Sequence, residues 1–189
     1  MPIQRTACLV LRADPAMGAA KAAETGSGSA SGDSSGSDRG SGDPPTRATK
    51  GKLTLRFSGA TDNIRAALRQ ARRHLASLPV PEDRLATIEL VLAEALNNVA
   101  EHAYAGTRPG PVTLNARHDG DRLCIVLRDM GRPLPGLVPP IGTPPDVNRP
   151  VDDLPEGGFG WFLIRDLTDH VDYVRHGSEN RLTLEFSTP

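Results

Sequence analysis

The chain has 189 residues, which is typical of one domain, and its 22 Lys and Arg nearly balance 23 Asp and Glu. This balance gives no support to a general nucleic-acid binder, which ordinarily carries a basic excess. Cys8 and Cys124 are far apart, and no paired Cys and His residues indicate a zinc site. The two cysteines therefore predict free thiols and a cytoplasmic protein.

The first fifty residues are predicted to form a disordered, Gly/Ser-rich N-terminal extension. Residues 26–45 read GSGSASGDSSGSDRGSGDPP and contain almost no apolar side chains. Such a segment buries too little apolar surface to offset the entropy lost on ordering. The apolar run at residues 8–11 is too short for a membrane span or a signal peptide, so no membrane contact is expected. We assign residues 1–50 to this extension and residues 51–189 to the folded domain.

A strand and a helix are predicted at the start of the domain. Residues 53–58 alternate apolar and polar side chains, as a half-buried strand does. Thr61 and Asp62 offer an N-cap for the helix that follows. Its apolar stripe consists of Ile64, Leu68, Ala71 and Leu75. Pro79 and Pro81 end it, because proline cannot continue the hydrogen-bond ladder.

A second helix is predicted from Asp83 to Tyr104. Seven apolar residues fall within an arc of roughly 100° and predict its core face. They are Leu85, Ile88, Leu92, Ala95, Leu96, Val99 and Ala103. Glu94 and Asn98 fall on the opposite side, one turn apart. Gly106 and the proline after it close the helix.

Two hairpins and a short helix are predicted in the second half of the domain. Residues 112–118 and 123–128 flank an Asp-Gly turn, which is a strong hairpin signal. The proline-rich residues 134–156 form a long loop of a kind that is usually functional or disordered. A helix at residues 159–167 precedes a second hairpin of residues 171–175 and 181–186. This order favours a two-layer α/β (α+β) sandwich, with a mainly antiparallel sheet and helices on one face.

The polar face of the second helix has residues that suit a magnesium-bound nucleotide. The amide oxygen of Asn98 is a hard ligand, and Mg²⁺ commonly takes one or two protein ligands beside phosphate oxygens and water. Glu94 lies about 6 Å away along the helix axis and can orient or deprotonate a hydroxyl group. The alternative is a solvated helix face that carries this pair by chance.

Two later motifs suit the base and the phosphates of a nucleotide. Asp129 ends an apolar strand and can accept a hydrogen bond from an adenine amino group, while Gly131 lets the backbone approach the ring. Gly157, Gly158 and Gly160 open the short helix, whose N–H groups favour phosphate. Alone, the first motif is more often a turn, and the second is as often a hinge.

Together, the segments 94–104, 129–133 and 157–164 resemble the N box, G1 box and G2 box of the GHKL, or Bergerat-fold, ATPases. With His102 and Tyr104 the first box is similar to that of the anti-sigma-factor serine/threonine kinases. The resemblance covers roughly residues 53–186. It implies the Bergerat fold and identifies residues 51–189 as a histidine-kinase-like ATP-binding domain.

The resemblance also implies ATP and Mg²⁺ as cofactors and a role for each matched residue. Glu94 would be the general base, Asn98 the Mg²⁺ ligand and Asp129 the acceptor for adenine. Thr183 matches a threonine that touches adenine through water. Relatives usually have leucine where this chain has Phe159 and Trp161.

A function follows from the same resemblance. The chain would be a serine/threonine protein kinase that phosphorylates a STAS-domain anti-sigma-factor antagonist and sequesters a sigma factor, without touching nucleic acid directly. Members of this branch commonly dimerise, so a homodimer is a further expectation. Two alternatives stay open. One is a nucleotide-dependent sequestration module with little or no kinase activity, and the other is the ATP-binding half of a histidine kinase, although residues 1–50 lack the pattern of a dimerisation helix.

Overall fold

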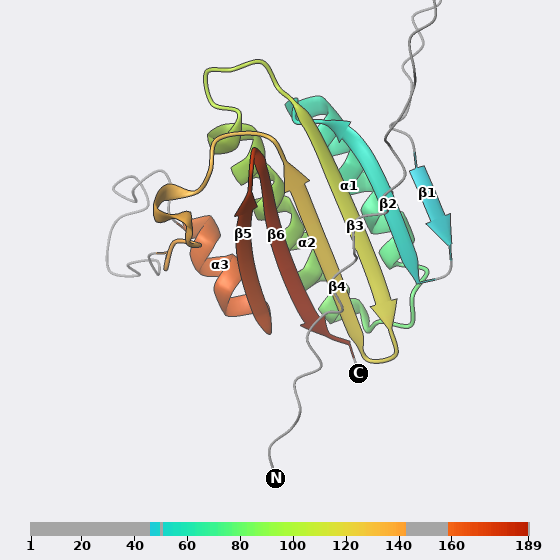
Figure 1. Ribbon diagram of the computed structural model, residues 1–189. Helices are drawn as coiled ribbons and strands as arrows, with labels where there is room; N and C mark the ends of the chain where they lie inside the picture. Colours follow the sequence, from blue (N-terminus) through green and yellow to red (C-terminus); the bar gives the residue numbers. More distant parts are fainter. Residues whose placement is uncertain (1–45, 50, 143–158, 189) are drawn as a thin grey trace, which may run out of the picture. The chain divides into compact units, whose positions relative to one another are not determined.

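The computed structural model describes residues 46–49, 51–142 and 159–188, which belong to one compact unit, Asp43–Pro189. Its sheet has the strand order β1-β2-β3-β4-β6-β5, and every neighbouring pair is antiparallel. The strands are β1 Thr46–Thr49, β2 Lys52–Ser58, β3 Pro111–Asp119, β4 Arg122–Asp129, β5 His170–His176 and β6 Glu179–Ser187. The helices α1 Thr61–Leu75, α2 Glu82–Asn98 and α3 Phe159–Leu167 cover one face (Figure 1). The predicted fold class is confirmed.

The core lies between the helices and alternate residues of the central strands. In β4, the alternate residues Leu123, Ile125 and Leu127 are buried. Their partners across the β4–β6 ladder are likewise every second residue of β6. Successive side chains of a strand point to opposite faces, so this alternation puts one apolar row of each strand against the helices. The opposite helical wall consists of Ile64, Ala67, Ala71, Leu75, Ile88, Val91, Leu92, Ala95, Leu96 and Ile164.

The N-cap of helix α1 lies one residue earlier than predicted. Ala60 occupies the N-cap position with extended backbone, and no side chain caps the helix. The Ala60 carbonyl accepts the hydrogen bond of Ile64 N at 3.0 Å, so the helical ladder already starts there. The prediction that Thr61 and Asp62 supply the cap is therefore wrong, and both lie inside the first turn.

Helix α2 does not run unbroken to Tyr104 as predicted. It ends at Asn98, and a single π-helical turn, η1 Val99–Ala103, follows. Five residues of a straight α-helix advance about 500°, which would turn Tyr104 about 140° away from Val99. The wider turn instead lets Tyr104 N bond to Val99 O at 3.1 Å, and both side chains are buried.

Both predicted hairpins and the short helix are confirmed. Asp119 pairs with Arg122 across a turn in which Gly120 has φ 65°, and His176 pairs with Glu179 across a turn with Gly177 at φ 59°. Positive φ is accessible to glycine at little cost, which explains why the chain reverses there.

The predictions for the first fifty residues and for the cysteines differ from the structure. Strand β1 lies inside the predicted extension and pairs with residues 52–55 of β2; the rest of the extension is outside the described residues, as is the loop from residue 143 to 158. Cys124 is not a free thiol, so the prediction of free thiols is wrong for it and no longer supports a cytoplasmic location. In the part of the chain that the structure describes, every helix is too short or too polar to cross a membrane.

Candidate functional site

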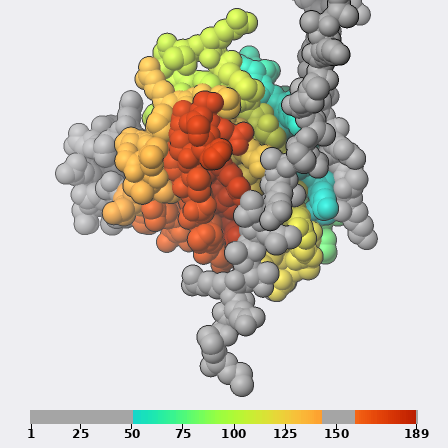
Figure 2. All heavy atoms as spheres, in the orientation of Figure 1, coloured from blue at the N-terminus to red at the C-terminus, as the bar shows by residue number. Residues whose placement is uncertain are grey.

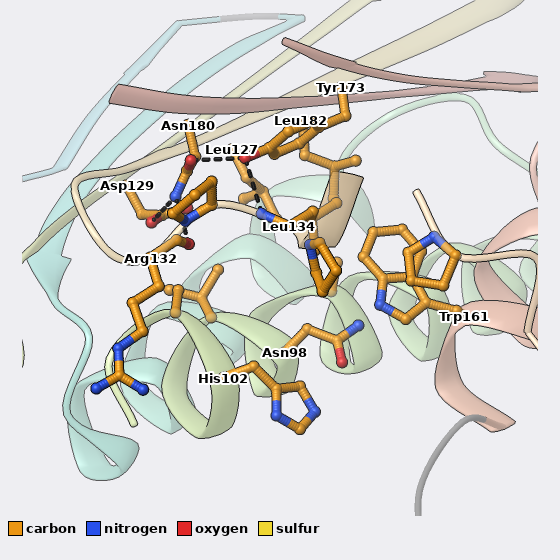
Figure 3. A pocket seen from close by; sticks show the side chains of 16 residues that line it. Asn98, His102, Leu127, Asp129, Arg132, Leu134, Trp161, Tyr173, Asn180 and Leu182 are labelled. Carbon is orange, nitrogen blue, oxygen red and sulfur yellow. Dashed lines mark hydrogen bonds between the residues drawn. The ribbon is translucent and has the colours of Figure 1, made fainter. Parts of the chain in front are cut away.

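A cavity of about 420 Å³ opens between the end of α2 and the sheet. Figure 3 shows Asn98 and His102 on the helical side and Asp129 and Asn180 on the sheet side. Most of the wall is apolar. The described residues that line it are Ala95, Asn98, Val99, His102, Ala103, Leu127, Asp129, Arg132, Pro133, Leu134, Pro135, Pro140, Trp161, Tyr173, Asn180 and Leu182. An apolar cavity with few polar groups is the usual form of a small-molecule site.

Asp129 is the buried carboxylate of this cavity, 8 % exposed at the end of β4. Its Oδ1 accepts hydrogen bonds from Gly131 N at 2.8 Å and Asn180 Nδ2 at 2.7 Å. Burial raises the pKa of Asp129, and these two donors and the charge of Arg175 partly oppose that rise. The donors therefore favour the ionised carboxylate, which is the form that accepts a hydrogen bond from an adenine amino group.

Asn180, on β6, is 3 % exposed and forms hydrogen bonds with several other residues of the site. Its Oδ1 accepts hydrogen bonds from Tyr173 Oη and Arg175 Nη1, both at 2.6 Å. Its Nδ2 bonds to Arg132 O at 3.1 Å as well as to Asp129. Tyr173 Oη in turn accepts Leu134 N at 3.1 Å, so the same residues hold the start of the proline-rich loop. Figure 2 shows the β5–β6 hairpin in red beside this orange segment.

Tyr104 fastens the segment after Asp129 to the sheet. Its hydroxyl donates to Pro111 O at 2.9 Å and accepts Met130 N at 3.0 Å. Gly131 lies against the π-helical turn, since a Cβ there would be 2.5 Å from Ala103 O. Its missing side chain therefore allows contact with Ala103, and Gly131 is not among the described residues that line the cavity.

Asn98 is the helical residue best suited to a metal-bound phosphate. Its Nδ2 is buried and has no hydrogen-bond partner among the described residues. Buried amides normally pair all their polar atoms, so this side chain fits a site completed by a bound molecule. The described residues contain no group of three or more His, Cys, Asp or Glu that could hold a metal. A single amide oxygen nevertheless fits Mg²⁺, which takes most of its other ligands from phosphate and water.

Glu94 lies one turn before Asn98 and packs against the start of α3. A Cβ added at Gly160 would be 2.6 Å from Glu94 Oε2. Neither residue is among the described residues that line the cavity. Gly157 and Gly158 lie outside the described residues, so their contacts with phosphate stay predictions.

Helix α3 closes the side of the cavity opposite Asp129. Trp161 is 8 % exposed and lines the wall. Arg165, one turn later, donates from Nε to Pro140 O at 2.7 Å and from Nη2 to Pro139 O at 2.6 Å. This guanidinium therefore ties the proline-rich loop to α3.

The structure does not bring Thr183 to the cavity. Thr183 pairs with Val126 across the β4–β6 ladder, whereas the cavity residues Leu127 and Leu182 form the neighbouring pair. Adjacent residues of a strand face opposite sides of the sheet, so Thr183 faces away from this cavity, and its contact with adenine stays a prediction that the cavity does not support. Sequence reasoning missed Asn180, which is in the same alternate row of β6 as Leu182 and therefore faces the cavity.

Three further residues of the cavity had no role in the sequence analysis: Arg132 and Trp161, which lie inside the G1 and G2 segments, and Tyr173. No local pattern could have marked Tyr173, since tyrosine is a common residue in a strand. For Asn180 one signal was available, namely a polar residue in the inward-facing row of an otherwise apolar strand.

A family model described as the histidine kinase-like ATPase domain matches residues 57–186. The chain is 36% identical over 92 residues to the serine-protein kinase RsbW of Halalkalibacterium halodurans, which covers 48% of this chain and 55% of that protein. It is 32% identical over 101 residues to the serine/threonine-protein kinase BtrW of Bordetella bronchiseptica, with coverage of 52% and 67%. The chain thus spans little more than half the length of the RsbW protein.

Among solved structures, the chain resembles that of the RsbU and RsbW domains of Rv1364c from Mycobacterium tuberculosis. The TM-score is 0.52 at 18% identity, and the match covers 75% of this chain and 34% of the other. At this identity the likeness shows a shared fold.

Proposed function

This chain belongs to the histidine kinase-like ATPase family, and we propose that it binds ATP and phosphorylates a serine or threonine of another protein. Its similarity to two proteins named as serine or serine/threonine kinases supports this choice within the family. We further propose the anti-sigma-factor role. The protein acted on would be a STAS-domain antagonist, and the protein sequestered would be a sigma factor.

One observation carries the ATP site. The buried carboxylate of Asp129 and Asn98, whose amide nitrogen has no partner among the described residues, come from opposite layers and line the same largely apolar cavity. An apolar slot with an acceptor at one side suits a purine ring whose amino group is a donor. An amide beside that slot suits the phosphate end. The side chains of Val99, Leu127 and Leu182 supply the flat apolar contact.

The residues divide the work of phosphate transfer. Asp129 orients the adenine ring. The half-buried Glu94 is the general base, which accepts the proton of the attacking hydroxyl. Asn98 would hold Mg²⁺, which when bound supplies positive charge beside the β- and γ-phosphates. His102 and the exposed Arg132 line the same cavity and add donors for phosphate. We propose a cytoplasmic location as well, because transcription takes place there, and a homodimer by analogy with the kinase branch.

Two substitutions separate binding from chemistry. Glu94→Gln should leave ATP affinity nearly unchanged and lower the rate of phosphate transfer by about 10²–10⁴-fold, the usual cost of losing a positioned base. Asn98→Ala should impair both ATP affinity and transfer. Calorimetric titration of Mg-ATP and incorporation of labelled phosphate into a candidate STAS-domain protein measure the two quantities.

Matched controls are available on the same helix and on the turn after it. Asn97→Ala changes the neighbouring, exposed amide and Glu101→Gln an exposed carboxylate, so both variants should behave as the wild type. A wild-type transfer rate in Glu94→Gln would show that another group is the base. ATP binding without transfer in any form of the protein would favour the sequestration module. A phosphohistidine product would favour the histidine-kinase reading.

A further inference from the structure

We propose that Asn180 is the positioning residue through which this site selects a purine with an amino group at position 6. The inference rests on the proposed ATP site and extends it to a residue that sequence reasoning did not identify. Its basis is a series of hydrogen bonds. Arg175 and Tyr173 donate to Asn180, and Asn180 in turn donates to Asp129. Each link is a hydrogen bond between side chains of β4, β5 and β6.

The orientation of the Asn180 amide is forced by its neighbours. A guanidinium has only donors, and Arg175 Nη1 lies 2.6 Å from one end of the amide, so that end must be the oxygen. Tyr173 Oη accepts Leu134 N and therefore has its own proton free for the same oxygen. The amide nitrogen must then face Asp129. An ambiguity that commonly affects asparagine side chains is thus resolved by chemistry.

This orientation determines which oxygen of Asp129 can reach a ligand. Oδ1 receives both the Asn180 amide and Gly131 N, whereas no donor to Oδ2 is found among the described residues. A carboxylate held in this way presents one free acceptor. The adenine 6-amino group is a donor and matches it, while the 6-keto oxygen of hypoxanthine is an acceptor and does not. Asn180 touches no reacting atom and acts only through Asp129.

Several other charged or titratable groups act on Asp129. The Tyr104 hydroxyl donates a hydrogen bond to Pro111 O and accepts one from Met130 N, which is next to Asp129 in the chain. Glu179 and Arg175 act on Asp129 through their charges. Arg132 and His102 line the same cavity. A comparison of ATP with inosine triphosphate separates these influences from the proposed one, because the two nucleotides differ only in the base.

The test is Asn180→Asp, which keeps the shape and replaces the donor that faces Asp129 with an acceptor. Two carboxyl groups at hydrogen-bond distance share a proton, so Asp129 loses the negative charge that strengthens its hydrogen bond to the adenine amino group. Calorimetry should show ATP affinity falling by about tenfold or more at pH 7, the usual effect of losing a charged hydrogen bond. The affinity for inosine triphosphate should stay within about threefold or rise.

The pH dependence provides a second readout that a merely structural role would not change. The loss of ATP affinity in Asn180→Asp should grow as the pH is lowered from 8.5 to 6, while the wild-type ratio of the two affinities stays nearly constant. A buried carboxyl pair holds its proton to higher pH than one carboxyl group does.

Two further variants keep the test decisive. Asn115→Asp makes the same chemical change on β3, where the side chain accepts a bond from Thr54 and is not among the described residues that line the cavity, and it should leave both affinities unchanged. Tyr173→Phe removes one donor to Asn180 but keeps the ring, and it should lower the preference for ATP by about threefold. It serves if Asn180→Asp fails to unfold cooperatively.

The outcomes are distinct. An unchanged ratio of ATP to inosine triphosphate affinity in Asn180→Asp, or in Tyr173→Phe if the first variant does not fold, overturns the role of Asn180 and leaves the ATP site standing. Equal loss for both nucleotides overturns it too, since it marks a general disturbance of the cavity. No ATP binding by the wild type overturns the proposed function and this inference with it.

Discussion

The absence of a side chain at Gly160 leaves room for the carboxylate of Glu94. A Cβ at this position would lie 2.6 Å from Oε2, which is the mobile end of the glutamate side chain. The backbone of α3 can therefore keep its place while the carboxylate moves. A residue expected to contact phosphate thus also determines where the proposed base lies.

Gly160→Ala should lower the rate of phosphate transfer by about tenfold or more, because the displaced Glu94 no longer meets the attacking hydroxyl. ATP affinity should change by less than about threefold. Transfer rates and calorimetric titrations of the two proteins measure this. Adding Gly160→Ala to Glu94→Gln should have little further effect on the rate if the two act together. A fall in ATP affinity larger than the fall in rate would instead favour a direct contact of Gly160 with phosphate.

At the scale of elements, the π-helical turn joins the two layers where the cavity opens. It returns Tyr104 to the core after Asn98, and the Tyr104 ring lies between Gly59 and Gly110, where a Cβ would come within 2.6 Å and 2.8 Å of it. The hydroxyl of Tyr104 then holds Met130, and through it the segment that carries Asp129 and Gly131. A single side chain thus sets the distance between the helical and the sheet side of the site.

Tyr104→Phe should lower the free energy of unfolding by about 1–3 kcal/mol, because Met130 N loses its described partner in a partly buried place. ATP affinity should fall too, since the Asp129 segment is less firmly held. Urea unfolding followed by circular dichroism gives the first quantity. Ser77→Ala removes an exposed hydroxyl that bonds to His74 O and should cost less than about 0.5 kcal/mol. Equal stability of Tyr104→Phe and the wild type would contradict this role.

At the scale of the molecule, the place where the folded unit begins lies earlier than composition alone indicates. The compact unit starts at Asp43, and β1 adds a strand to the edge of β2. Deleting residues 1–42 should leave Mg-ATP affinity within about tenfold, or about 1.4 kcal/mol, of the full chain. Deleting residues 1–50 should lower the unfolding temperature, because it removes β1 and leaves the β2 edge unpaired.

Both deletions are compared with the full chain by calorimetry and thermal unfolding. A reducing agent in every sample keeps the cysteines of all three proteins in the same oxidation state. A loss of ATP affinity greater than tenfold on removing residues 1–42 would show that the extension contributes to the site. Equal unfolding temperatures of the two deletions would show that β1 adds nothing to stability.

The sequence by itself determined the elements and the principal polar residues of the site. Alternation of period two marked β2, β3, β4 and β6, and the spacing of apolar residues marked α1 and α2, because burial on one face leaves a local periodic record. The Asp-Gly turn marked its hairpin for the same local reason. Asn98 and Asp129 stood out because their motifs are short and continuous.

Only the tertiary structure decided which polar groups meet. Asn180 reaches Asp129 across 51 positions of sequence, through the register of β4 and β6, which no local pattern specifies. The same register turned Thr183 to the opposite face. The π-helical turn at Val99–Ala103 depends on the packing of Tyr104 between two loops rather than on helix propensity. Contacts between distant segments therefore decided the shape of the site, because their energies depend on three-dimensional register and leave no periodic trace in the chain.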